Sequence, residues 1–453
     1  MNTWLLRFDI SPRVVLADRE QAVTVKSLDS SYLFFDRVEY LVTVIRTDGW
    51  KYVKGKELTS GGRDLFTEYK IHPKDGVITF THNFTGEGEW EIKINYAEDQ
   101  KPLVERSVNR WSVGKNRWIN GFSFRMYSLK SDLYSKRPYK GDLHVHTIES
   151  DGYESPQFVA AQYRKYGYDF IAITDHYYMQ SSVDAVNALK DIDSGLKIFP
   201  GEEVHPIAAG GIFHVVNFNG KKSVNELYNS NPEKAKAEIE NIAKSIDEID
   251  QTDRLELAYF KWIFDNIRDG GGIAIYPHAF WQVGYGYHVR PYISDKIIRG
   301  KMCDAYEVFG GMSKRDNREM AEYAAELRAD GIDLPMVASS DSHSTRAHGY
   351  LHFDDVWTMV FAKDKEDIPS AILNGDTVVV DNFNESDKIA HGKLRLVKYA
   401  NFLIEQYYEF HDELCSATGQ ALIRYVLNDK SQKDLVERLD NERKVFDKKF
   451  FGK

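Results

Sequence analysis

The chain has 453 residues, of which 42% are hydrophobic and 28% are charged, and its formal net charge is −10. This length predicts two or three domains, and the composition is that of a globular protein. The acidic pI of about 5.8 argues against a general nucleic-acid binder, which would carry a basic surface. No run of about 18 apolar residues is present, so no membrane-spanning helix and no membrane partner are expected.

The cysteine content and the first residues of the chain indicate the cellular compartment in which the protein is expected. Cys303 and Cys415 are the only cysteines, which are too few for a disulfide framework or a thiolate metal site and indicate a reducing compartment. The opening MNTWLLRFDISPRVV lacks a basic segment followed by an apolar one, so no secretion signal is expected. We therefore expect a soluble cytoplasmic protein. The sequence does not decide whether it forms a homo-oligomer.

Residues 1–138 have the pattern of short β-strands. AVTVKSL, YLVTVIR, GVITFTH and EWEIKINY alternate apolar and polar residues, and turn signals such as TDG, PKDG and TGEGE separate them. Several short strands at this spacing predict a β-rich, sandwich-like domain. We interpret its aromatic side chains as core residues rather than as a platform for a ligand.

Residues 139–382 alternate short apolar runs with helical patterns. The runs are rich in β-branched residues and include FIAIT, LKIFP, HVVNF, GIAIYP, AYEVFG and MVASS. One helix is expected to begin with Ser155 as its N-cap and Pro156 at its first position, and a charged helical excursion is expected over 223–268. This alternation predicts an α/β fold built on a parallel sheet or barrel.

Residues 383–453 are polar and helical. LRLVKYANFLIEQYYEFHDEL and KDLVERLDNERKVFDKKF place apolar residues three and four positions apart, as amphipathic helices do. We interpret this C-terminal helical extension as a packing or oligomerisation element rather than as part of a catalytic site.

Histidines and carboxylates lie at the ends of the apolar runs. In GDLHVHTIESDG, His144 and His146 project to one side of an extended segment. The other runs begin, end or continue with the same residue types: Asp151, Asp175, His176, Glu202, Glu203, His205, His214, His278, Glu307, Asp341 and His343. Because the C-terminal ends of parallel strands meet at one mouth of a barrel, these side chains are expected to converge.

This convergence predicts a metal centre. A single histidine at a strand end is more often an ordinary hydrogen-bonded residue, but the coincidence of so many with carboxylates is not explained in that way. Histidine and carboxylate ligands without cysteine suit Zn, Mn or Fe. The ligand groups are too numerous for one ion, so two or three divalent ions sharing a bridging carboxylate are expected. Such ions lower the pKa of a bound water, which predicts hydrolysis.

The motifs resemble those of the PHP (polymerase and histidinol phosphatase) superfamily over residues 139–382. HxHTxxSDG, the TDH after a strand, GxE, a single histidine, PH and SDSH are similar to the family's motifs and come in the same order. The resemblance implies a distorted (β/α)7 barrel with a trinuclear metal centre that acts on phosphoesters, in a stand-alone branch of the superfamily. Some relatives in that branch hydrolyse carbamates or other carboxyl esters.

The resemblance also implies which residues hold the metals. The first ion would take His144, His146, Glu203 and Asp341. The second would share Glu203 with His214 and His278, and the third would take Asp151, His176 and His343. Glu202 beside Glu203 leaves the identity of the bridging carboxylate open, although the GxE spacing from Gly201 favours Glu203.

A metal-dependent hydrolase is the function that we expect, with a small-molecule phosphoester as substrate. A carboxyl-ester, carbamate or amide hydrolase with the same cluster is an alternative, as is a non-catalytic metal-containing binding protein. His205 is a candidate general acid, and Asp175 is expected to orient a ligand. In WQVGYGYHVRP, His288 and Arg290 are candidates for holding the substrate, with an anion suited to the arginine. Further candidates near the mouth are Lys314, Arg315, Asn317, Arg346 and His348.

Overall fold

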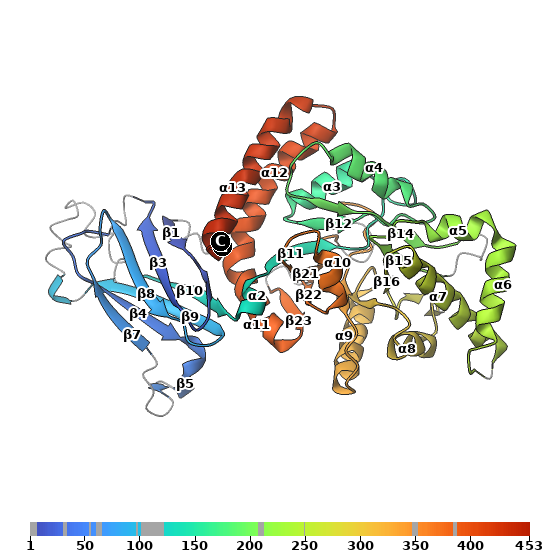
Figure 1. Ribbon diagram of the computed structural model, residues 1–453, viewed down its shortest axis with the longest axis horizontal. Coiled ribbons are helices and arrows are strands. Elements are labelled where there is room, and N and C mark those ends of the chain that lie inside the picture. The colour runs from blue at the N-terminus through green and yellow to red at the C-terminus, as the bar shows by residue number, and fades with distance from the viewer. Residues whose placement is uncertain are drawn as a thin grey trace. The chain divides into compact units, whose positions relative to one another are not determined.

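The chain folds into two compact units (Figure 1). The β-rich unit comprises residues 1–136, 402–409 and 443–453, and the α/β unit comprises residues 137–401 and 410–442. This mixed α/β fold, with a β-rich N-terminal region and a helical C-terminus, confirms the predicted fold class at that level. The computed structural model describes residues 7–29, 34–53, 56–59, 66–96, 98–100, 122–206, 213–248, 250–346, 352–383 and 387–453.

Two sheets make up most of the β-rich unit. The first has the order β1 (Phe8–Ser11), β3 (Glu20–Ser27) and β8 (Val77–Asn83). The second has the order β2 (Val14–Leu16), β10 (Phe122–Leu129), β9 (Gly88–Tyr96), β4 (Tyr40–Arg46) and β7 (Phe66–Ile71). A separate ribbon pairs β5 (Trp50–Val53) with β6 (Lys56–Thr59). Short helical turns are Thr47–Gly49, Glu98–Gln100 and α2 (Ser131–Tyr134).

The core of the β-rich unit lies between these sheets. Strand β3 alternates exposed and buried residues and buries Val23 and Val25 completely, as the alternation in its sequence predicts. Phe8 of the first sheet stacks on Phe122 of the second, with 4.0 Å between the ring centroids. Both rings are buried, so these aromatic residues belong to the core as interpreted.

The α/β unit contains two larger sheets. One has the order β13 (Lys197–Phe199), β12 (Phe170–Ala172), β11 (Arg137–Asp142), β21 (Val356–Ala362), β22 (Thr377–Asp381) and β23 (Ile389–Gly392). The other has the order β14 (Gly201–Val204), β15 (Val215–Phe218), β16 (Ile273–Tyr276), β19 (Ala305–Phe309) and β20 (Met336–Ala338). Isolated bridges pair Val145 with Ser342 and His176 with Glu203. The closed seven-stranded barrel remains a prediction.

Strand directions in the α/β unit differ in part from the predicted parallel arrangement. Strands β11–β12–β13 and β16–β19–β20 are parallel, but β15 runs antiparallel to both β14 and β16, and β21 runs antiparallel to β11. Residues 205–214 between β14 and β15 are too few for the helical crossover that a parallel neighbour requires. Strand β15 therefore returns beside β14, which places His214 next to Glu203.

Helices cover the sheets of the α/β unit. They are α3 (Pro156–Lys165), α4 (Gln180–Leu189), α5 (Val224–Ser230), α6 (Pro232–Ala243), α7 (Gln251–Asp269), α8 (Pro291–Arg299), α9 (Lys314–Ala329) and α10 (Ile368–Leu373). The predicted start at Pro156 is confirmed, although the Ser155 side chain makes no capping hydrogen bond. The predicted helical excursion over 223–268 is three helices, α5 to α7, because Asn231 and Pro232 begin a new helix.

The C-terminal helices are α11 (Leu394–Leu403), a π-helical turn (Ile404–Tyr408), α12 (Glu409–Val426) and α13 (Lys433–Phe451), with a short 3₁₀ turn at Lys430–Gln432. Residues 410–442 belong to the α/β unit, where Arg164 of α3 makes a buried ion pair with Asp440, 2.9 Å apart. Buried His411 lies 3.4 Å from Asp169 and 2.9 Å from Asp412. Within the described residues, no helix combines the length and apolarity needed to cross a membrane.

A substitution at Gly419 tests how closely α12 packs on α3. A Cβ atom at Gly419 would lie 2.3 Å from backbone atoms of Lys165. Alanine normally stabilises a helix over glycine by about 1 kcal/mol. Here we expect Gly419→Ala to lower the free energy of unfolding by about 1–3 kcal/mol, because the added methyl group overpacks the contact. Chemical denaturation measures this value.

Gly286→Ala is the matched control, because its Cβ would meet no atom within 4 Å. Its free energy of unfolding should stay within about 0.5 kcal/mol of the wild-type value. A stabilised Gly419→Ala protein would show that the two helices do not approach each other this closely.

Candidate metal centre

Two segments that are distant in sequence pair just beyond β11 and β20. The His146 N–H donates to the Ser342 carbonyl at 2.8 Å, and the Asp341 N–H donates to the His144 carbonyl at 2.9 Å. This pairing brings Asp341 Oδ1 within 3.2 Å of His144 Nε2 and within 3.0 Å of His146 Nε2. The HxH and SDSH motifs therefore supply one common cluster of side chains.

Asp142 fixes the register of these two segments. Its buried carboxylate accepts hydrogen bonds from the backbone N–H groups of His144 at 3.2 Å and Ser340 at 3.1 Å, and from the Tyr163 hydroxyl at 3.0 Å. Burial raises the pKa of Asp142 to about 7, although these hydrogen bonds act in the opposite direction. Asp142 thus holds the backbone beneath the cluster rather than entering it.

Glu203 lies at the centre of the cluster. It is 1% exposed, and its two oxygens lie between 2.8 and 3.4 Å from ring nitrogens of His144, His146, His176, His214 and His278. One oxygen faces His214 and His278, and the other faces the remaining three rings. Burial acts to raise the pKa of Glu203, but the surrounding histidines hold it well below its ordinary value.

Glu202 has a different environment. Successive residues of a strand point to opposite faces. The Glu202 carboxylate accepts hydrogen bonds from Asn217 Nδ2, Ser223 Oγ, the Val224 N–H and Asn225 Nδ2, at distances from 2.6 to 3.1 Å. These donors come from β15 and the start of α5, so Glu202 ties this region together while Glu203 faces the histidines.

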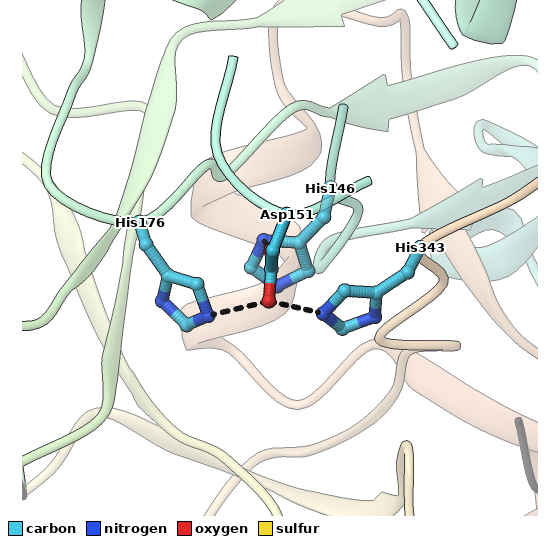
Figure 2. A group of neighbouring side chains, drawn as sticks. All are labelled: His146, Asp151, His176 and His343. Atoms are coloured by element: carbon cyan, nitrogen blue, oxygen red, sulfur yellow. Dashed lines mark hydrogen bonds and ion pairs between the residues drawn. The ribbon is translucent and has the colours of Figure 1, made fainter. Parts of the chain in front are cut away.

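Asp151 adds His343 to the cluster and also approaches His146 and His176 (Figure 2). Its Oδ2 lies 3.2 Å from His343 Nε2 and 3.7 Å from His176 Nε2, and its Oδ1 lies 3.7 Å from His146 Nδ1. Figure 2 shows the rings of His176 and His343 directed toward this carboxylate from either side. Burial acts to raise the pKa of Asp151, but the hydrogen bond with His343 and the neighbouring rings hold it well below its ordinary value.

Asp175 shapes the turn that carries Asp151. It accepts hydrogen bonds from the Thr147 N–H at 2.6 Å, the Thr147 hydroxyl at 2.7 Å and the Ser150 hydroxyl at 2.7 Å. The sequence predicts that Asp175 orients a ligand, and these contacts show where it acts. It holds the turn before Asp151, and it is also linked to the cluster through the Ser150 hydroxyl, which lies 3.1 Å from Asp151 Oδ1 and 3.4 Å from His146 Nδ1.

The side chains form three groups that could each hold a metal ion. They are His146, Asp151, His176 and His343; His144, His146 and Asp341; and Glu203, His214 and His278. Within each group, the potential ligand atoms lie within 4.8 Å of one another. Together the groups contain all nine residues that the resemblance implies as metal ligands. Their nitrogen and oxygen donors, without sulfur, suit borderline metals such as Zn, Mn or Fe.

Residues 142–266, which include most of this cluster, match the family model of the PHP domain. Residues 142–266 therefore carry a PHP domain. The resemblance predicted over residues 139–382 is thereby confirmed for residues 142–266. No curated protein matches the chain.

Several solved structures are similar to parts of the chain. A two-domain protein from Bacteroides vulgatus with a predicted PHP-like metal-dependent phosphoesterase is 17% identical, with a TM-score of 0.36, over 54% of this chain and 65% of that one. The chain therefore spans just under two thirds of that relative. A Bifidobacterium adolescentis protein, also a predicted metal-dependent phosphoesterase, is 20% identical, with a TM-score of 0.33, over 48% and 93% of the two chains. A Chromobacterium violaceum amidohydrolase with bound sulfate is 17% identical, with a TM-score of 0.32, over 55% and 99%.

Glu307 contacts two histidines of the cluster but belongs to none of the three groups. The sequence shows it only as one more carboxylate in an apolar run. In the structure, its Oε1 lies 3.0 Å from His144 Nδ1, and its Oε2 accepts the His278 backbone N–H at 3.1 Å. Glu307 is fully buried. It can therefore fix the orientation of the His144 ring and leave the other nitrogen of that ring directed at Glu203 and Asp341.

Two of the nine cluster residues have an unusual backbone. His278 has a φ of 31° and Asp341 a φ of 52°, in the region that residues other than glycine rarely adopt. Such strain is concentrated at functional sites, where the surrounding structure enforces it. No sequence pattern in the chain indicates these conformations.

His205 and His288 lie beside the cluster without belonging to any of the three groups. The ring centroid of His214 is 4.3 Å from that of His205 and 4.5 Å from that of His288. His205 Nδ1 is also 3.2 Å from His176 Nδ1. Burial, followed by the charges of His214 and His278, lowers the pKa of His288 to about 3. Both predicted residues therefore lie next to the cluster, in contact with its histidines.

The arginine predicted to hold an anion is engaged elsewhere. Arg290 Nη2 is 2.6 Å from Asp253 and also pairs with Glu256, both from α7. These two carboxylates already pair with the guanidinium group. This pairing argues against Arg290 as a residue that binds an anionic substrate. The sequence could not show this, because the acidic residues come from the preceding helix.

The other residues predicted to lie near the mouth of the barrel differ in whether their side chains already have partners. Lys314 Nζ donates to the Phe383 carbonyl, Arg315 pairs with Glu319, and the buried Asn317 side chain donates to backbone carbonyls. Arg346, three residues after His343, is exposed, and its guanidinium has no ion pair or hydrogen bond within the described residues. His348 lies outside the described residues.

Glu203 and Glu202 give a matched pair for testing the centre of the cluster. We expect Glu203→Gln to lose most bound metal, because the charge shared by five histidine contacts is removed. Glu202→Gln should keep its metal but lower the free energy of unfolding by about 1–3 kcal/mol, because an amide N–H₂ would then face hydrogen-bond donors. Elemental analysis and denaturation of both proteins measure these effects. Equal metal content in wild type and Glu203→Gln would contradict the central role of Glu203.

Proposed function

We propose that the chain is a metal-dependent phosphoesterase that hydrolyses a small-molecule ester. The observation that carries this proposal is the buried Glu203 carboxylate shared by five histidines, flanked by two further groups of ligand atoms. The PHP-domain match supports a metal-dependent hydrolase. We also propose that the two sheets of the α/β unit form a distorted (β/α)7 barrel with the cluster at its mouth.

The nine cluster residues would hold two or three divalent ions. We propose that His144, His146 and Asp341 hold one, that His214 and His278 hold a second, and that Glu203 bridges them. Asp151, His176 and His343 would hold the third. Bound ions would supply Lewis acidity and a water of lowered pKa near neutral pH.

Residues around the ligands have separate tasks in this proposal. Glu307 orients His144, Asp142 sets the register of the paired segments, and Asp175 holds the turn before Asp151. His205 donates a proton to the leaving oxygen, because its ring lies beside His176 and His214 but is not one of the grouped ligands. His288 borders the same face and contacts the substrate.

The guanidinium of Arg346, unpaired within the described residues, is our reason for proposing a phosphoester as substrate rather than a carboxyl ester, a carbamate or an amide. Of the arginine and lysine residues nominated from the sequence, Arg290, Lys314 and Arg315 have partners, whereas Arg346 has none within the described residues. A guanidinium can form paired hydrogen bonds with a phosphoryl group that retains negative charge during hydrolysis. A neutral carboxyl ester or amide offers no such charge.

A substrate panel tests the reaction class. The metal-loaded protein should hydrolyse phosphomonoesters or phosphodiesters, and chelation followed by re-addition of Zn, Mn or Fe should abolish and restore the activity. Arg346→Ala should raise KM for phosphoesters by about tenfold or more, because a charged hydrogen bond is lost. Arg315→Ala, which removes an exposed and already paired arginine, is the control. Hydrolysis of carboxyl esters or amides alone would contradict the proposal, and a loaded protein without hydrolytic activity would support a binding role.

The leaving group tests His205. We expect His205→Asn to lower kcat for an alkyl phosphate by about a hundredfold, because the departing alkoxide needs a proton. The effect on 4-nitrophenyl phosphate should be small, since that leaving group departs as a stable anion. Steady-state kinetics of both substrates measure the difference, with His72→Asn in the β-rich unit as control. Equal losses on the two substrates would assign His205 to metal or substrate positioning instead.

A further inference from the structure

A small hairpin begins at the wall of the metal centre. Strands β17 (Gln282–Val283) and β18 (Gly286–Tyr287) pair in antiparallel register. The His288 N–H donates to the Trp281 carbonyl at 2.9 Å and closes the base of the hairpin. The Trp281 ring centroid is 5.3 Å from that of His278 and 5.1 Å from that of His288. The hairpin is therefore attached directly to the side of the cluster that contains His278.

The base of the hairpin is anchored. The Gln282 side-chain amide donates to Asp316 Oδ1 at 3.1 Å, and Asp316 is itself buried. The Asp316 N–H donates to Ser313 Oγ at the start of α9. A fixed polar contact on one side and the Trp281 ring on the other hold the base in place, so the tip is presented at a defined position beside the metal centre.

The tip presents apolar and aromatic groups to solvent. Tyr285 is fully exposed, Val283 is 48% exposed and Tyr287 is 39% exposed. No hydrogen bond or ring contact engages Tyr285 within the described residues. Gly284, with a φ of 62°, permits the tight turn. Tyr285 is four residues from Trp281, so at about 3.3 Å per residue the two backbone positions are at most about 13 Å apart, and their long side chains can approach the same ligand.

The charged residues next to the hairpin limit the classes of ligand that its tip can bind. Arg290 is paired with Asp253 and Glu256, Lys314 donates to a backbone carbonyl, and Arg315 is paired with Glu319. Among the described residues that flank the hairpin, these cations are not available to a second anionic group. Tyrosine and tryptophan rings instead bind planar rings by stacking or edge-to-face contact.

We propose that the hairpin tip and Trp281 bind a planar aromatic ring in the leaving group of the ester. The preferred substrates are then esters that combine one anionic centre at the metals with a neutral aromatic group at the hairpin. This inference rests on the proposed hydrolase function, which it extends by a substrate class. It predicts weaker binding of substrates in which a second phosphate would face the hairpin.

Two matched ligands test the proposal on the metal-loaded full chain. Benzyl phosphonate and cyclohexylmethyl phosphonate resist hydrolysis and differ only in whether the ring is aromatic, and calorimetry gives their dissociation constants. We expect the benzyl compound to bind about three- to tenfold more tightly, as an aromatic contact allows. Tyr285→Ala should remove most of this preference, and Tyr285→Phe should retain it. Tyr425→Ala, a tyrosine on α12, is the control.

Kinetics with benzyl phosphate and cyclohexylmethyl phosphate then separate this inference from the proposed function. The ratio of their kcat/KM values should follow the binding preference in each variant. Absence of turnover on either ester would contradict the phosphoesterase proposal, while phosphonate binding would still decide the role of the hairpin. Equal binding of the two phosphonates by the wild type, or an unchanged preference in Tyr285→Ala, would overturn the inference.

Discussion

The α/β unit depends on the burial of one carboxylate among five imidazole rings. Removing Glu203 from water costs several kcal/mol unless positive charge compensates it. Five protonated rings would repel one another, and five neutral rings would leave the carboxylate without a counter-charge. Divalent ions would resolve this conflict, because they would supply positive charge while the imidazoles stay neutral and act as ligands. The surrounding carboxylates of Asp142, Asp175 and Glu307 hold the backbone and rings in place for this arrangement.

The candidate site was largely predictable because its residues obey a simple positional rule. Most of the apolar runs that carry these residues end at the cluster, and the antiparallel run of β15 begins there, so the ligand-type residues at those ends converge. His144, His146 and Asp341 could be nominated in this way without knowledge of how their segments pair. The choice between Glu202 and Glu203 could not be made from the residues alone. It depends on which face of β14 meets the polar side chains of β15 and α5.

Other features depended on contacts between distant segments. Arg290 seemed available in the sequence, yet carboxylates from α7 capture it, and no local pattern indicates that pairing. The antiparallel direction of β15 was missed because an apolar run carries no information about its direction. The short connection from β14 was the available signal, since a parallel neighbour needs a longer crossover. The domain boundaries near residues 138 and 382, taken from changes in pattern, remain predictions.

The ligand groups join segments that range along the chain from His144 to His343. Ions held there would act as cross-links that close long loops, and they would bind the folded chain far more strongly than the unfolded one. By linkage, the stability of the α/β unit would then rise with the logarithm of the free ion concentration. The lifetime of the folded protein would in this way follow the metal supply around it. Metal scarcity would reduce the amount of intact protein as well as the activity of each molecule.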